Sequence, residues 1–199
     1  MSLFEEELLE PLPRLFRFIK AFNEIPKNKS VSVADLGCGP KIRAYFAMKK
    51  SGIKILNYFG IDPLISKQVV NEFAFYPSIK LVPKAFDKKI PLADSSVDFI
   101  ISLAVLEHID HPELILQDIP RVLKKNGKAI ITTPTPRAKG ILEFFSYKLG
   151  IISRREIEEH QNYFMKEDLL SMIKSRHDII VSHSYFEFGL NNLLVIEKK

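Results

Sequence analysis

The segment that most constrains the fold of this chain is VSVADLGCGP at residues 31–40. An apolar run reaches an acid, Asp35, and two glycines follow at Gly37 and Gly39. The run is typical of a buried strand, and the glycines allow a tight turn in which the backbone comes close to a ligand. An amphipathic segment begins after the turn, so the free N–H groups of a helix start point at the same place. This order of elements predicts a nucleotide-sized binding site.

Two common nucleotide sites do not fit this turn. The dinucleotide fingerprint G-x-G-x-x-G/A needs a third small residue for close approach of the diphosphate. That position is Ile42 here, and the G-K-[ST] ending of a phosphate-binding loop is missing as well. The acid before the glycines suits a ligand that carries an amine or ammonium group. For this motif by itself, an ordinary strand, turn and helix without a ligand remains the alternative.

The pattern D-x-G-x-G after a strand resembles the first motif of class I S-adenosylmethionine-dependent methyltransferases. The resemblance implies that Asp35 lies close to the amino-acid part of the cofactor. It also implies that the turn Gly37-Cys38-Gly39 borders the cofactor. Many members have a third glycine where this chain has Lys41. The Lys41 side chain either points to solvent or meets the carboxylate of the cofactor.

A second acid stands at the end of the next predicted strand. Residues 53–61 are strand-like and are followed by Asp62-Pro63. An acid at this place can accept hydrogen bonds from both hydroxyls of a ribose, as in dinucleotide folds. Asp62 matches the ribose-binding acid of the family, and Pro63 ends the strand. A helix N-terminal acid is the alternative role of Asp62.

Residues 86–134 resemble the central block of the same family. The pattern I-P-L-x-D-x-S-x-D at residues 90–98 leads into a buried strand over residues 99–103. A helix then begins at Pro112, and we expect it to end at Asn126-Gly127, because both residues tolerate a left-handed conformation.

The residues expected at the adenine end of the cofactor match the family pattern less closely. Phe86 occupies the slot of the acid that contacts the adenine amine in the family, and Asp87 comes one position later. Either Asp87 reaches the amine, or Phe86 packs on the adenine and a backbone group makes the contact. Leu103, at the end of the fourth strand, completes the predicted cofactor residues.

Methyl transfer from a sulfonium is an in-line displacement, so the enzyme mainly positions the acceptor and excludes water. A general base is needed only where the acceptor must lose a proton. The candidates follow the fourth strand, where ligands bind in such sheets. They are His108 as a base and Glu107 as an acceptor contact, with helix capping or packing as the alternative role of His108. No metal site is predicted.

The order of elements favours an α/β fold, Rossmann-like and doubly wound, with a mostly parallel seven-stranded sheet and helices on both faces. Strands and helices alternate to residue 133. A helix over residues 166–175 and two strands, over residues 179–188 and 193–197, follow; their short turn predicts an antiparallel C-terminal hairpin. An amphipathic helix comes first, with an apolar face made of Leu12, Leu15, Phe16, Ile19 and Phe22.

We expect a single methyltransferase domain over residues 1–199, since this length suffices for one full core. Residues 1–29 form an N-terminal helical extension in this interpretation. Residues 135–164 interrupt the alternation and are expected to cover the acceptor, because long connections are often functional lids. A helix packed on the domain surface, or a basic helix at a lipid interface, is the alternative for this insertion.

Composition points to the cytoplasm. The single cysteine, Cys38, rules out an internal disulfide and fits a reducing compartment. No apolar run is long enough for a membrane span, and the acidic N-terminus lacks the order of a secretory signal. The net charge of +5 comes from scattered basic residues, and no nucleic-acid module accompanies it, which argues against nucleic acid as a partner.

The resemblance implies S-adenosyl-L-methionine as the cofactor and a small-molecule or lipid- or sugar-linked precursor as the acceptor. An RNA methyltransferase, which would gain from a basic surface, is one alternative. A non-catalytic module that binds S-adenosylmethionine is the other. Peripheral contact with a membrane stays open, and the sequence does not indicate an oligomeric state.

Overall fold

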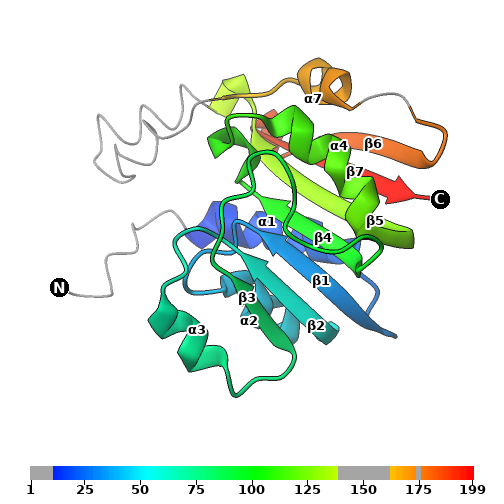
Figure 1. Cartoon of the computed structure of the whole chain (residues 1–199). Coiled ribbons are helices and arrows are strands. Elements are labelled where there is room, and N and C mark those ends of the chain that lie inside the picture. Colours follow the sequence, from blue (N-terminus) through cyan, green and yellow to red (C-terminus); the bar gives the residue numbers. More distant parts are fainter. Residues whose placement is uncertain (1–10, 139–161, 174–175) are drawn as a thin grey trace.

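The computed structural model describes residues 11–138, 162–173 and 176–199 (Figure 1). Its strands form one seven-stranded sheet in the order β3-β2-β1-β4-β5-β7-β6. The strands are β1 (Ser30–Leu36), β2 (Lys54–Ile61), β3 (Ile79–Val82), β4 (Val97–Leu103), β5 (Leu123–Pro134), β6 (Ile179–Phe186) and β7 (Asn191–Lys198).

Strands β1 to β5 run parallel, whereas β7 pairs antiparallel with both β5 and β6. This confirms the predicted Rossmann-like sheet with its antiparallel hairpin. The strand order reverses direction at β1, which lies between β2 and β4. Ligands bind at such a switch point, outside the carboxyl ends of the strands.

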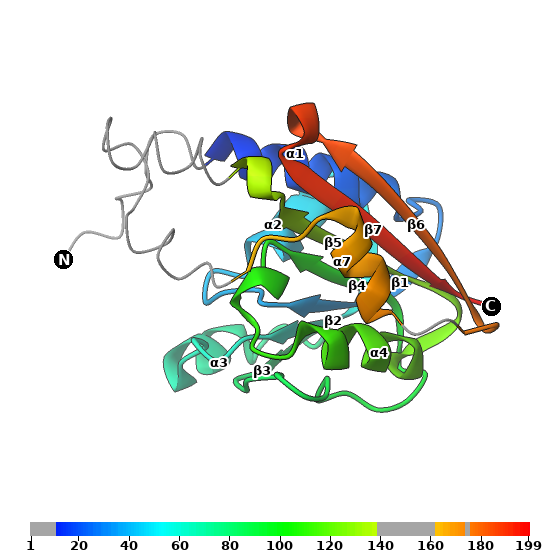
Figure 2. The same ribbon diagram turned by 90° about the horizontal axis from the view of Figure 1, so that it is seen from above.

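Helices cover both faces of the sheet (Figure 2). Alternate strand residues belong to two separate cores. Ala34 and Leu36 pack with α4 and α7, while Val31 and Val33 pack with α1 and α2. This period of two is what a sheet covered on both sides requires. The helices are α1 (Pro11–Asn23), α2 (Arg43–Lys50), α3 (Lys67–Phe73), α4 (Pro112–Val122) and α7 (Lys166–Met172), with short 3₁₀ turns η1 (Leu106–His108) and η3 (Glu187–Gly189).

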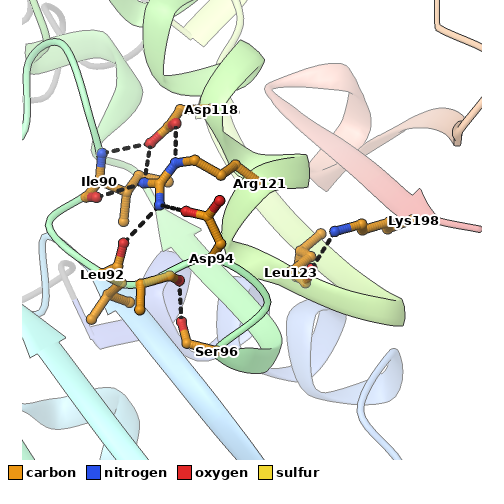
Figure 3. A network of polar contacts seen from close by, with 9 residues as sticks. Ile90, Leu92, Asp94, Ser96, Asp118, Arg121, Leu123 and Lys198 are labelled. Atoms are coloured by element: carbon orange, nitrogen blue, oxygen red, sulfur yellow. Dashed lines mark hydrogen bonds and ion pairs between the residues drawn. The ribbon is translucent and has the colours of Figure 1, made fainter.

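The connection from β3 to β4, residues 83–96, is held against α4 by a polar network (Figure 3). Arg121 on α4 donates to both carboxylate oxygens of Asp118, at 2.7 and 2.9 Å, and to Asp94 at 2.7 Å. It also donates to the carbonyls of Ile90 and Leu92. The hydrogen bonds and charge of its carboxylates raise the pKa of Arg121. The acids of the I-P-L-x-D-x-S-x-D pattern therefore have structural partners: Asp94 binds Arg121, and Asp98 accepts from the Ser32 N–H at 2.8 Å.

The first helix, α1, is amphipathic as predicted, but only part of its apolar face is buried. In α1, Ala21 and Phe22 are buried, whereas Leu15, Phe16 and Ile19 are each about half exposed. Periodicity defines an apolar face, but which part of that face is covered depends on how the helix packs against β4 and β5.

The predicted end of the helix at Asn126-Gly127 is wrong, since α4 ends at Val122 and β5 starts at the next residue. The N–H groups of Ser95 and Ser96 reach the last helical carbonyls at 2.8 and 2.9 Å. Residues 124–127 instead form a bulge between the pairs Val97↔Leu123 and Phe99↔Lys128. Asn126 does adopt the left-handed conformation, with φ 60°. Asn126-Gly127 therefore does interrupt the regular structure, but the interruption is a bulge inside the strand and not the end of the helix.

Residues 139–161, most of the predicted acceptor-covering insertion, lie outside the described residues, as do the first ten residues of the N-terminal extension. The described flanks of the insertion are held at the carboxyl edge. Thr135 N–H donates to the carbonyl of Leu190 at 2.8 Å, and Asn162 N–H donates to that of Glu107 at 3.3 Å. None of the helices described is both long enough and apolar enough to cross a membrane.

Candidate functional site

The glycine turn after β1 has the geometry that its sequence predicts. Gly37 has φ 73°, and its N–H donates to the carbonyl of Ile61 at 2.8 Å. A Cβ added here would lie 2.4 Å from Cγ2 of Val105, which follows β4. Only glycine therefore fits, both for its backbone angle and for its contact across the switch point.

Gly39 joins the turn to the predicted ribose acid. Its N–H donates to Oδ2 of Asp62 at 2.8 Å, and the Leu64 N–H donates to Oδ1 at 2.7 Å, with Pro63 between them in the chain. A carboxylate has about four acceptor positions, so Asp62 keeps capacity for further hydrogen bonds. Gly39 has φ 64°, and a Cβ added to it would meet no atom within 4 Å. The space in front of this residue is open to a ligand.

Asp35 lies beneath the turn and is 3% exposed. It accepts a hydrogen bond of 2.5 Å from the hydroxyl of Tyr58 on β2. Burial raises the pKa of Asp35 to about 7, the Tyr58 hydrogen bond opposes this rise, and the charge of Asp62 adds to it. An ammonium or sulfonium group nearby would favour the charged carboxylate. The sequence analysis missed Tyr58, because a tyrosine in an apolar strand carries no signal of a partner.

Cys38 fills a small space inside the turn. A Cβ on Gly60 would lie 2.9 Å from its Sγ, so the thiol packs closely over β2. Burial raises the pKa of the Cys38 thiol, and the nearby charges of Asp35 and Asp62 raise it further. The thiol is therefore neutral, and its role at this position is packing.

At the adenine end, Phe86 and Asp87 differ in exposure. Phe86 is buried in the core with Leu36 and Ile61, whereas Asp87 is exposed. Leu103 is half-buried at the end of β4. The next residue, Ala104, adopts φ 58°, and its N–H donates a hydrogen bond to the carbonyl of Thr132. The carboxylate of Asp87 is thus available to a ligand, while the ring of Phe86 is committed to the core.

Lys41 is exposed and lines a groove between α2 and α3 with Glu72 and Phe46. Its neighbour Ile42 is fully buried and left-handed, with φ 39° and ψ 45°. A β-branched residue is strained in this conformation, and burial of its side chain in the core with α2 offsets the strain.

Of the two predicted catalytic residues, the structure buries only Glu107. Its side chain is fully buried in η1, and neither carboxylate oxygen has a hydrogen-bond partner in the described part of the chain. Burial raises the pKa of Glu107 to about 7, although its own backbone N–H and, less strongly, the charge of Arg17 on α1 lower it. A buried carboxylate in this state is costly unless a ligand or a proton satisfies it. His108, the next residue, is exposed.

A buried network of polar side chains, which the sequence did not reveal, lies across β5, β7 and β6. Asn192 donates to the hydroxyl of Thr133 at 3.0 Å and to the carbonyl of Phe164 at 2.9 Å. Its amide oxygen lies 2.8 Å from Nε2 of His183. Thr132, also buried, has a hydroxyl with no partner among the described residues. Thr133 lies 59 residues from Asn192 in the sequence, so no local motif could have connected β5 to the hairpin. Among the described residues, no group of His, Cys, Asp or Glu is placed to hold a metal ion.

Comparison with known proteins shows the family to which the chain belongs. Residues 5–176 match the family described as a methyltransferase domain. The ubiquinone/menaquinone biosynthesis C-methyltransferase UbiE of Campylobacter jejuni is 24% identical over 190 residues, covering 85% of this chain and 80% of the relative. The chain therefore belongs to the methyltransferase-domain family, and it is a class I S-adenosylmethionine-dependent methyltransferase.

Solved structures share the fold. A Haloferax volcanii methyltransferase, in complex with the activator Trm112, has a TM-score of 0.69 and 18% identity, covering 93% of this chain and 90% of the other. A protein of Listeria monocytogenes described as an S-adenosylmethionine-dependent methyltransferase has a TM-score of 0.68 and 16% identity, covering 96% and 100%.

Proposed function

We propose that the carboxyl ends of β1, β2 and β4 hold S-adenosylmethionine, and that the methyl group passes to a small-molecule or lipid- or sugar-linked acceptor. The cofactor supplies an electrophilic methyl group. The turn Gly37–Gly39 borders its amino-acid part above Asp35, and Asp62 with Pro63 takes the ribose. Asp87 offers a carboxylate at the adenine end, and Leu103 forms the opposite wall.

The observation that carries the cofactor assignment is the link between Gly39 and Asp62. The carboxylate is held at 2.8 Å by the turn and at 2.7 Å by its own loop, so its orientation is set before a ligand arrives. It stands beside the open space at Gly39. Such a preorganised acceptor binds vicinal hydroxyls without a further ordering cost.

The acceptor assignment rests on Glu107. Its unpartnered, buried carboxylate follows β4 at the switch point, and its own backbone carbonyl anchors Asn162. With a pKa near neutrality it can accept a hydrogen bond from a hydroxyl or amine of the acceptor and take up a proton released on methylation. The Campylobacter jejuni relative, named a C-methyltransferase of quinone biosynthesis, supports a small-molecule acceptor.

The ribose contact can be tested with a ligand and a protein change together. Titration calorimetry would compare S-adenosylhomocysteine with its 2′-deoxy analogue, on the native chain and on Asp62→Asn. We expect the native chain to lose about tenfold in affinity for the analogue, and the variant to bind both ligands alike. An equal loss in both proteins would contradict the ribose role of Asp62, even if the turn itself is weakened.

The acceptor class can be tested with S-adenosylmethionine labelled in its methyl group. The protein would be incubated separately with lipid, polar-metabolite and RNA fractions of a cell extract. We expect label in the lipid or polar fraction, lost in Glu107→Gln while the affinity for S-adenosylhomocysteine is unchanged. Label in RNA, with binding that falls steeply with salt, would favour the RNA alternative. Cofactor binding without transfer to any fraction would favour the non-catalytic module.

A further inference from the structure

One arginine of α4 fixes the backbone of the connection between β3 and β4. All five N–H donors of the Arg121 guanidinium form hydrogen bonds (Figure 3). Three of these bonds go to the carboxylates of Asp118 and Asp94. The other two go to the carbonyls of Ile90 and Leu92, at 2.9 and 2.8 Å. A planar fork with every donor in use holds these groups in one arrangement, which the point charge of a lysine does not reproduce.

Ile90 is the residue at which this network fixes the connection most completely. Its N–H donates to Oδ2 of Asp118 at 2.8 Å, its carbonyl accepts from Arg121, and its side chain is fully buried. Burial alone would raise the pKa of Asp118, but the hydrogen bonds from Arg121 and from the Ile90 N–H outweigh it and lower the pKa. Asp118 is therefore charged at neutral pH, and hydrogen bonds to a charged acceptor are the stronger ones. Both polar groups of the Ile90 backbone are thus bound to side chains of α4.

A second fixed point lies shortly before Ile90 in the chain. Phe86 is buried in the core that includes the last residues of β1 and β2, at the carboxyl edge of the sheet. Residues 87–89, which we call the tip, are all exposed and separate Phe86 from Ile90. Consecutive Cα atoms are about 3.8 Å apart, so a tip of this length has little freedom between two fixed ends.

Asp87 is the first residue of the tip. Among the described residues, its carboxylate has no hydrogen-bond or ion-pair partner. The place of this carboxylate is therefore set by the backbone on either side of it, that is, by Phe86 and Ile90. The hold on Ile90 comes from α4, which is distant from Asp87 in the sequence.

We propose that Arg121, acting with Asp118, is a positioning residue for the adenine end of the cofactor. The pair holds Ile90, and the tip between Ile90 and Phe86 then presents the Asp87 carboxylate to the amine of the adenine. This role rests on the proposed function, in which Asp87 lies at the adenine end. A carboxylate that is placed before the ligand arrives binds the amine without a further ordering cost, and this preorganisation is the contribution of Arg121.

Titration calorimetry with two ligands tests this role. S-adenosylhomocysteine would be compared with its purine analogue, in which hydrogen replaces the 6-amino group of adenine. We expect the native chain to bind the analogue about tenfold more weakly, because a hydrogen bond to a charged carboxylate is lost. Asp87→Ala should remove this difference. Arg121→Lys should reduce it to less than about threefold, although it leaves every atom of Asp87 in place.

Two controls separate this role from a general loss of structure. Arg121→Lys should still bind the 2′-deoxy analogue about tenfold more weakly than S-adenosylhomocysteine, because the N–H groups of Gly39 and Leu64, and not α4, hold Asp62. Lys124→Ala is the matched protein control. It removes an ion pair of 3.1 Å with Asp98 in β4, leaves the Arg121 network intact, and should keep the tenfold discrimination of the adenine amine.

Asp118→Asn replaces Arg121→Lys if circular dichroism shows that the latter does not fold. An amide oxygen cannot accept from both Arg121 and the Ile90 N–H as the two carboxylate oxygens do, so the same reduction is expected.

The outcomes distinguish this role from the proposed function. If the folded variant keeps the tenfold difference that Asp87→Ala removes, the positioning role is overturned and the proposed function stands. An equal fall in the discrimination of the amine and of the 2′-hydroxyl would also overturn the positioning role, since it would report a general loss of structure. A native chain that binds S-adenosylhomocysteine but does not discriminate the amine would remove Asp87 from the adenine end, and the role of Arg121 with it. A native chain that does not bind S-adenosylhomocysteine would overturn the proposed function itself.

Discussion

The cofactor side and the acceptor side of the carboxyl edge satisfy their buried polar groups in different ways. Around the glycine turn, Asp35 is paired with Tyr58, and Asp62 is paired with the N–H groups of Gly39 and Leu64. Beside β4 and β5, the carboxylate of Glu107 and the hydroxyl of Thr132 are buried without a partner among the described residues. On the proposed cofactor side, each buried carboxylate therefore has a partner in the protein, and Asp62 keeps capacity for a ligand. The proposed acceptor side keeps two buried polar groups without a partner among the described residues.

From this difference between the two sides, we expect the largest loss of cofactor affinity from a substitution in the glycine turn. Gly37→Ala places a Cβ 2.4 Å from Val105 at a left-handed φ. The affinity for S-adenosylhomocysteine, measured by calorimetry, should fall by roughly 100-fold, about 3 kcal/mol. Val105→Ala in the same protein should restore part of it.

Gly52→Ala is the control for backbone strain. Gly52 also has a positive φ, of 82°, but a Cβ there meets no atom within 4 Å. It should lose about 1 kcal/mol of stability and none of its affinity. If Gly37→Ala behaved in the same way, the contact with Val105 would not limit the turn.

On the acceptor side, Glu107→Gln should stabilise the protein above neutral pH. The pKa of Glu107 is about 7 in the folded chain, against 4.5 for an ordinary glutamate carboxyl, so the folded state binds more protons between these values. Stability of the native chain therefore falls as pH rises from 4.5 to 7 and then stays level. Chemical denaturation should show the variant to be more stable by about 3 kcal/mol at pH 8, with this gain disappearing near pH 4.5.

Glu167→Gln, at an exposed position in the first turn of α7, should show no such gain. An equal pH dependence in this control would mean that the burial of Glu107 is not the cause.

Asp35 should make the affinity for the cofactor depend on pH. With a pKa of about 7, its carboxyl is mostly protonated at pH 6 and mostly charged at pH 8. The affinity for cationic S-adenosylmethionine should rise about tenfold over this range. Asp35→Asn should remove this rise, and the same titration of the variant accounts for the ligand's own ionisation. A rise that persists in the variant would assign the titration to another group.

The smallest effect is expected at Lys41, which stands where the motif that this sequence resembles has a third glycine. Its side chain lines the groove between α2 and α3 with Glu72, so it does not crowd the turn. Lys41→Ala should change the affinity for S-adenosylhomocysteine less than twofold. A larger loss of affinity would mean that the lysine pairs with the cofactor's carboxylate after all.

The sequence by itself determined the glycine turn, the parallel order up to β5 and the C-terminal hairpin. These features depend on local properties: the φ preference of glycine, the apolar runs of strands and a short turn between two of them. The acid–proline pair at Asp62-Pro63 follows the same logic, since its position at a strand end can be read directly.

Only the tertiary structure decided which part of the apolar face of α1 is buried, that Asn126 lies in a bulge, and that Tyr58 binds Asp35. It also separated Glu107 from His108, which are neighbours in the sequence although the first is buried and the second is exposed. These outcomes follow from helix packing, strand register and contacts between residues far apart in the chain. Local propensity carries none of that information, because burial is set by what packs on a residue and not by the residue type alone.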